Sequence, residues 1–154
     1  MFKKRVSSQN LFMKNNHKII IGTAVLAILL VLVLASQPKN VEITTDMGNY
    51  EPGSYLTVSI KNNTSQSICF SGCYPYYLEQ KKDSEWAAYD YGECQEKDQV
   101  AKCILKNEIK AFKLTLTNTE TGFHRLRLPV CIGCAVGQDY RIDKVFYSNL
   151  FEVR

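Results

Sequence analysis

The chain has 154 residues, of which 45% are hydrophobic and 22% are charged, and its formal net charge is +4. The first 36 residues hold five basic and no acidic side chains, so the remainder holds 14 of the 19 basic residues against all 15 acidic ones, a net charge of −1. That balance excludes the basic surface typical of nucleic-acid binding, and we expect no nucleic-acid partner.

An apolar segment at residues 19–35 is the strongest signal near the N-terminus. It carries no charge, and as a helix it would be about 25 Å long, slightly less than the ~30 Å hydrocarbon core of a membrane. Basic residues precede it, whereas only Lys39 follows it closely, so the positive-inside rule predicts a cytoplasmic N-terminus. We expect a cytoplasmic basic segment at residues 1–18 and a single-pass signal anchor in the cell membrane at residues 19–35.

A cleaved signal peptide is the alternative for the same segment. Val33 and Ala35, followed by Ser36, have the small-residue spacing that signal peptidase accepts, and cleavage after Ala35 would give a secreted protein. The apolar run exceeds the usual ~7–15 residues of a signal peptide, which favours the uncleaved anchor. Both interpretations place the rest of the chain outside the cytoplasm, as a short linker at residues 36–40 and one domain at residues 41–154.

Alternation of apolar and polar residues predicts strands throughout the exported domain. The pattern is clearest at residues 54–61, 109–117 and 123–128. Weaker candidates are residues 41–45, 67–70, 74–80, 85–89, 99–104, 139–147 and 150–153. Turn-forming residues such as Pro52-Gly53 and Asp83-Ser84 separate these segments, and no helical period interrupts them. We expect an all-β fold, a β-sandwich of about 7–9 strands.

Five short motifs occur in order along this domain. They are residues 50–53 (YEPG), 61–64 (KNNT), 78–79 (LE) with Trp86, 122–126 (GFHRL) and 147–153 (YSNLFEV). This order resembles the bacterial immunoglobulin-like domains of small exported or membrane-anchored proteins. The resemblance implies an immunoglobulin-like sandwich whose last strand is structural, and it implies no activity. His124 stands where the family pattern usually has tyrosine, so a tyrosine-corner hydrogen bond is not implied at that strand.

All six cysteines of the chain lie in the exported domain: Cys69, Cys73, Cys94, Cys103, Cys131 and Cys134. An even number in an oxidising compartment predicts disulfides, although spacing alone does not select among the possible pairings. In a sandwich, the strand ends near residues 69–73 and 130–134 are candidates for spatial neighbours. Cys94 and Cys103 are candidates to close the charged loop between them, with a stabilisation of roughly 2–3 kcal/mol.

Two sharper interpretations of the cysteines stay open. Cys69 and Cys73, taken with Cys131 and Cys134, have a spacing close to that of a four-cysteine zinc site. Cys131 and Cys134 also form a CxxC pair, the motif of thiol oxidoreductases, but a reactive CxxC usually begins a helix and this one follows a strand and Pro129. Export favours structural disulfides, and we expect neither a metal nor another cofactor.

Catalytic residues are not predicted. His124 is the one histidine of the exported domain, and the strand pattern places it on the same face as Leu126 and Leu128. We interpret it as a core or rim histidine with satisfied hydrogen bonds rather than a catalytic base. The sequence has no HExxH motif, no glycine-rich phosphate loop and no EF-hand pattern, so we expect a protein that is not an enzyme.

Aromatic residues are concentrated between residues 74 and 91. Tyr77 and Trp86 are interpreted as core, because a tryptophan in the central hairpin of a sandwich usually packs inside. The other tyrosines lie nearer strand ends and loops, where the ring offers contact area and the hydroxyl a polar tip. They are the predicted binding surface, with ordinary rim packing as the alternative: Tyr74, Tyr76, Tyr89 and Tyr91.

These features favour a non-enzymatic, membrane-anchored extracytoplasmic domain that acts as an interaction module. The expected partner is an envelope protein or a surface polymer. Two alternatives from other classes are an exported protease inhibitor that presents the loop 95–102, and a thiol-redox or metal-binding envelope protein that uses Cys131 and Cys134.

Overall fold

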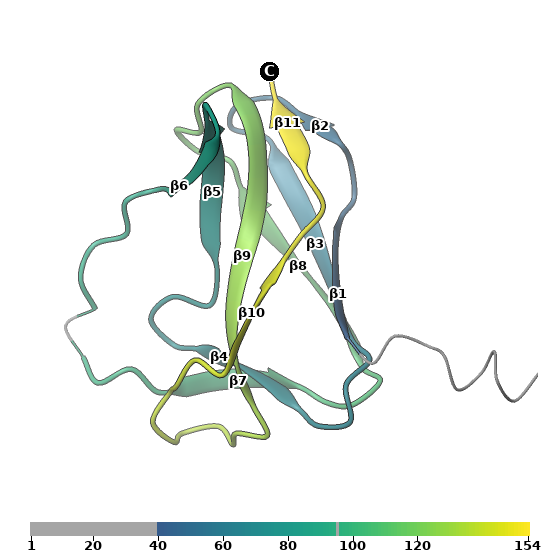
Figure 1. The fold of residues 1–154 in the computed structure, drawn as a ribbon, viewed down its shortest axis with the longest axis vertical. Coiled ribbons are helices and arrows are strands. Elements are labelled where there is room, and N and C mark those ends of the chain that lie inside the picture. Colours follow the sequence, from purple (N-terminus) through teal and green to yellow (C-terminus); the bar gives the residue numbers. More distant parts are fainter. Residues whose placement is uncertain (1–39, 95) are drawn as a thin grey trace, which may run out of the picture. The chain divides into compact units, whose positions relative to one another are not determined.

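The computed structural model describes residues 40–94 and 96–154, and within these ranges every regular element is a β-strand (Figure 1). The predicted cytoplasmic segment 1–18, the anchor 19–35 and the linker up to residue 39 lie outside the described residues. The part of the chain that is described contains no helix with the length and apolarity to cross a membrane. The all-β prediction is confirmed for the described residues.

Eleven strands form where seven to nine were expected. They are β1 (Val41–Thr45), β2 (Asn49–Tyr50), β3 (Tyr55–Asn62), β4 (Ile68–Ser71), β5 (Tyr77–Lys82), β6 (Glu85–Ala88), β7 (Val100–Ile104), β8 (Ile109–Thr115), β9 (Gly122–Ile132), β10 (Lys144–Tyr147) and β11 (Phe151–Val153). Ten of them coincide with predicted segments to within a few residues. The exception is β2, which is too short to show any alternation.

The strands make two sheets. A three-stranded antiparallel sheet has the order β1-β3-β8, and the remaining eight strands form a sheet around the long strand β9. One edge of β9 pairs with β11 and then β10, and its other edge pairs with β5 and then β4. The outer positions are taken by β2 beside β11, β6 beside β5, and β7 beside β4. Figure 1 shows β9 running through the centre of this arrangement.

One hydrophobic core fills the space between the two sheets. The small sheet contributes the buried face of β3, with Leu56, Val58 and Ile60 each at most 1% exposed. The large sheet contributes alternate residues of β9, of which Leu126 and Leu128 are the centre. The two-layer packing of inward faces over one core confirms the predicted β-sandwich.

Pro129 lies within β9, where a missing N–H group would ordinarily break the pairing of a central strand. On one side of β9 the pairing with β5 extends as far as Arg127, and the pairing with the next partner, β4, starts at Cys131. Pro129 therefore lies at the gap between two partners, and on the other side it is paired with Val145 of β10. The long strand changes neighbours at the one residue that cannot donate a backbone hydrogen bond.

Asn62, the last residue of β3, ties the two sheets together from a fully buried position. Its Nδ2 donates to the carbonyls of Gln66, Ile104 and Leu105 at 2.8–3.2 Å. Its Oδ1 accepts from the N–H and the hydroxyl of Thr64. The side chain thus satisfies the end of β7 and the turn after β3 simultaneously, which fixes both relative to the core.

Candidate functional site

All six cysteines are paired, as predicted, and the pairs are Cys69–Cys103, Cys73–Cys94 and Cys131–Cys134. The expected closure of the loop 95–102 by Cys94 and Cys103 is wrong. Cys103 lies directly opposite Cys69 in the β4–β7 ladder, and Cys94 instead reaches Cys73 after β4. The loop between Cys94 and Cys103, which the protease-inhibitor alternative would present, is instead tethered at its two ends to Cys73 and Cys69, and that alternative stays a prediction.

The predicted proximity of residues 69–73 to residues 130–134 is confirmed, because Cys69 is opposite Cys131 in the β4–β9 ladder. Cys69, Cys131 and Cys134 are buried with Val100 in a second small core. Cys131, Cys134 and Asp143 have ligand atoms within 4.8 Å of one another, an arrangement compatible with a metal ion only if both sulfurs are thiolates. Both sulfurs are bonded to each other, and the carboxylate of Asp143 accepts from the Ile132 N–H and the Arg141 guanidinium.

His124 is buried within β9, as predicted for a core histidine. Its Nδ1 lies 2.8 Å from the carbonyl of Gly122, so that nitrogen carries the proton, and its Nε2 lies 3.0 Å from the hydroxyl of Tyr89 and accepts from it. Burial lowers the pKa of His124 below its ordinary 6.5. With both ring nitrogens held by structural partners, the imidazole is neutral and has no open position for a substrate.

The outer face of the large sheet corrects the placement of Trp86. Its ring is only half-buried, and it lies on the outside, where the guanidinium of Arg125 is stacked between it and Tyr147 at 4.1 Å from each ring centroid. Arg125 Nε donates to a carboxylate oxygen of the buried Glu79 at 2.7 Å. The tryptophan therefore packs against an arginine and shields an ion pair, because the β5–β6 register places Trp86 opposite Lys81, on the same outer face of β5 as Glu79.

A second arginine extends the same outer layer. Arg127 lies over the ring of Tyr77, which is also half-buried rather than core, and its Nε is 3.3 Å from the other oxygen of Glu79. Glu79, Arg125 and Arg127 are not among the site residues predicted from the sequence. The sequence feature that could have identified them is the Arg-x-Arg alternation in β9, because it places both arginines on the face of the strand opposite to that of Leu126 and Leu128 and so indicates a charged outer layer.

The four tyrosines predicted as a binding surface are all half-buried. Tyr74 packs against Tyr77 and Tyr91 with ring centroids 5.8 Å apart in each pair. The hydroxyl of Tyr91 accepts from the N–H of Leu78, and that of Tyr89 accepts from the N–H of Glu120. Burial raises the pKa of Tyr76, Tyr89 and Tyr91, so these phenols stay protonated at neutral pH. The rings of Tyr76, Tyr89 and Tyr91 line a depression, whereas Tyr74 lies outside it.

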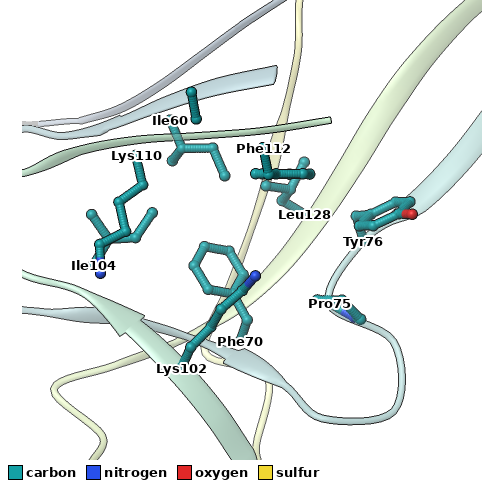
Figure 2. Close-up of a pocket in the computed structure, with 10 residues that line it drawn as sticks. Ile60, Phe70, Pro75, Tyr76, Lys102, Ile104, Lys110, Phe112 and Leu128 are labelled. Carbon is teal, nitrogen blue, oxygen red and sulfur yellow. The ribbon is translucent and has the colours of Figure 1, made fainter. Parts of the chain in front are cut away.

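That depression is a pair of adjacent pockets between β8 of the small sheet and the facing edge of the large sheet. The first has a volume of about 110 Å³ and a mostly apolar lining, shown in Figure 2, that includes Phe70, Ile104 and Phe112. The second, of about 180 Å³, is lined by Tyr89, Tyr91 and the end of β8. Tyr76 borders both and stacks on Phe112, with centroids 6.0 Å apart. We refer to the two pockets together as the β8 groove.

Two lysines border the first pocket, one from each sheet (Figure 2). Lys110 of β8 is occupied, since its ammonium lies 3.3 Å from the Glu108 carboxylate and donates to the Cys103 carbonyl. Lys102 of β7 has its ammonium 5.5 Å from the centroid of the Phe112 ring. Among the ion pairs of the described residues none involves Lys102, so its charge faces the groove uncompensated.

The backbone of β8 is open along this groove, because β8 is an edge strand. The Glu108 carbonyl accepts from Asn62 and the Leu116 N–H donates to Ser54, so the even-numbered residues of β8 direct their hydrogen bonds toward β3. In an antiparallel ladder the intervening residues direct theirs the other way. The outward N–H and C=O groups are therefore those of Ile109, Ala111, Lys113 and Thr115.

Comparisons with known proteins add little. Neither a protein-family model nor a curated protein matches the sequence. Among solved structures, the chain is similar to the alkylpurine DNA glycosylase AlkC of Pseudomonas fluorescens (13% identity, TM-score 0.37, covering 81% of this chain and 33% of that one). It is also similar to the sporulation control protein Spo0M of Bacillus subtilis (19%, 0.41, 74% and 48%) and a β-glucosidase of Listeria innocua (18%, 0.28, 74% and 16%). The chain spans less than half of each, and likenesses this weak carry no functional argument.

Proposed function

We propose that the protein is a non-enzymatic interaction module: an immunoglobulin-like sandwich, held at the outer side of the cell membrane by residues 19–35, that binds an extended segment of an envelope protein along the β8 groove. The observation that carries this proposal is the coincidence of an open strand edge with two pockets beside it. Three of the four tyrosines expected to form the binding surface, Tyr76, Tyr89 and Tyr91, line these pockets.

Support for an extracytoplasmic location comes from the cysteines. Three disulfides in a domain of this size are typical of proteins that fold in an oxidising compartment. The uncharged run at residues 19–35, preceded by basic residues, supports the anchor. Among the described residues the one histidine is His124, and both of its ring nitrogens are occupied, so the structure offers no histidine base in support of an enzymatic alternative.

The binding mode we propose is addition of a strand. An extended peptide that pairs with β8 would receive main-chain hydrogen bonds from the outward groups of Ala111 and Lys113, and its alternate side chains would point toward the groove. The first pocket lies beside Lys110 and Phe112, and the second beside Leu114 and Leu116. Four residues of strand span about 13 Å, so apolar side chains four positions apart in the peptide would enter the two pockets.

A binding assay with a defined peptide tests this proposal. The probe is a labelled, capped peptide in which every second residue is Thr and the residues between are, in order, Gln, Phe, Gln, Phe and Gln. All the larger side chains then share one face of the strand, and the two Phe are four positions apart. We expect saturable binding to the full-length chain in detergent micelles, measured by fluorescence anisotropy, with empty micelles as the blank. The same peptide with proline at its central position cannot form the ladder and should not bind.

Ala111 supplies the matched variants on the protein. Ala111→Pro removes an outward N–H without removing a β3–β8 hydrogen bond, and should weaken peptide binding about tenfold, the cost of leaving one backbone partner unsatisfied. Ala111→Ser keeps the N–H and should bind as the unmodified chain does. Equal binding by the proline and serine variants, or no binding of the peptide at all, would contradict strand addition at β8.

A further inference from the structure

The β8 groove contains a feature that strand addition alone does not explain. Both edge strands that flank the first pocket carry a lysine on the inward-facing side, Lys110 opposite Ile60 and Lys102 opposite Phe70. An inward-pointing charge on an edge strand discourages pairing with apolar strands. A groove built only to take apolar side chains would not place two ammonium groups at its border.

The two lysines differ in what they contact. The charge of Lys110 is balanced by Glu108, whereas the ammonium of Lys102 lies over the face of the Phe112 ring, 5.5 Å from its centroid. A cation above an aromatic face keeps its attraction for an anion, because the ring supplies no counter-charge. Lys102 is therefore the group that a negatively charged ligand would meet at the first pocket.

The size of the first pocket indicates what accompanies the charge. Its volume of about 110 Å³ is of the same order as the cavity of about 150 Å³ that accepts a benzene molecule in another protein. That space suits one branched or aromatic side chain and is too small for the acyl chain of a lipid. The occupant that fits both the space and the charge is a peptide with a large apolar side chain near a carboxylate.

Resting on the binding mode proposed above, we infer that the β8 groove selects extended peptides that carry an acidic residue on the same face as the apolar residue that enters the first pocket, with Lys102 as the residue that determines this specificity. Residues on one face of a strand lie two positions apart, so the acidic residue is two positions from the apolar one. The lysine disfavours binding of uncharged apolar strands and favours binding of the carboxylate, so one residue increases the difference in affinity between the two kinds of peptide.

Net charge does not produce the same preference. The chain beyond residue 36 carries a net charge of −1, so an acidic peptide gains nothing from long-range attraction to the domain as a whole. A preference for acid must come from a local cation. Lys113 provides the comparison, because it belongs to the same strand as Lys110 but lies opposite Thr57, on the outer face of the small sheet.

The test replaces the three Gln of the neutral probe by Glu in one peptide and by Lys in another. With the full-length chain we expect the Glu peptide to bind about two- to fivefold more tightly than the Gln peptide, the range for a partly exposed ion pair, and the Lys peptide to bind more weakly than both. Lys102→Gln should abolish the difference between Glu and Gln peptides, and Lys113→Gln should preserve it. Added salt should reduce the difference in the unmodified chain.

Equal binding of the Glu and Gln peptides, or a Glu preference that survives Lys102→Gln, would overturn the role of Lys102 and leave strand addition intact. Absence of binding by every peptide would overturn both proposals. Lys102 is exposed, so its replacement does not disturb the core, and an unchanged unfolding midpoint of Lys102→Gln checks this.

Discussion

Replacement of Glu79 by glutamine tests the account of the outer layer. Glu79 is 6% exposed, and its two oxygens face Arg125 Nε at 2.7 Å and Arg127 Nε at 3.3 Å. Glu79→Gln keeps the size of the side chain and one acceptor but removes the negative charge. Two guanidinium groups would then lie next to each other on neighbouring positions of the same strand face without a counter-ion.

The magnitude follows from the two contacts. A hydrogen bond to a charged group contributes about 1.5–3 kcal/mol, and this applies to the 2.7 Å bond from Arg125. The contact with Arg127 lacks hydrogen-bond geometry, and the Arg127 side chain is 33% exposed, so this contact adds at most a few tenths of a kcal/mol. Since glutamine retains an acceptor, we expect a loss of about 2 kcal/mol in the free energy of unfolding.

Urea unfolding followed by the fluorescence of Trp86, the single tryptophan of the chain, measures this loss. The midpoint should fall while the slope stays unchanged. Glu152→Gln is the control, because its ion pair with Arg154 is 3.9 Å long and exposed, and its removal should cost less than about 0.5 kcal/mol. A Glu79→Gln variant as stable as Glu152→Gln would refute the reasoning that the outer layer is held by a buried ion pair.

Three further predictions concern stability. Because burial lowers the pKa of His124, the unfolded chain takes up a proton first as the pH falls. The contribution of this histidine to the free energy of unfolding should be constant above about pH 6.5 and fall below it by up to ~1.4 kcal/mol per pH unit, and His124→Gln should flatten this dependence in urea titrations at pH 7 and 5. Asn62→Ala should lower the free energy of unfolding by about 3 kcal/mol, against a much smaller loss for Asn63→Ala, since buried carbonyls lose their donor. Replacement of both cysteines by alanine should lower the free energy of unfolding by about 3–4 kcal/mol for the pair Cys69–Cys103 and by about 1.6 kcal/mol for the pair Cys131–Cys134, because the two disulfides close loops over sequence separations of 34 and 3. Equal losses of stability in thermal melting would argue against the chain-entropy account.

Local pattern predicted the strands well because alternation and turn chemistry are local properties. β3 and β9 appear where the sequence alternates, and Asp83, with a φ of 54°, forms the tip of the β5–β6 hairpin as the Lys82-Asp83-Ser84 sequence indicated. The same pattern does not say which face of a strand meets which neighbour. Trp86 was placed in the core by its chemistry, whereas the register of β6 on β5 puts it outside.

Properties that depend on pairing between strands far apart in the sequence could not be predicted from local patterns. The partner of Cys103 is decided by the β4–β7 register, over 34 residues of sequence. The β8 groove combines residues of β4, β7 and β8 with the connection that contains Tyr76, so no segment of the sequence shows it. The tyrosines were recognised by their concentration, but that they line a groove follows only from the edge position of β8.

The placement of the two terminal strands has a mechanical consequence. β1 begins at Val41 and pairs with β3 antiparallel from Val41 opposite Asn62 to Thr45 opposite Val58, and in Figure 1 it starts at the end of the domain away from the C-terminus. Tension applied between residue 41 and residue 154 would pull β1 along its own axis, and would load β11 against β9 in the same way. The ladder bonds of both strands would then be strained together rather than one after another, so the domain is built to resist stretching between its ends.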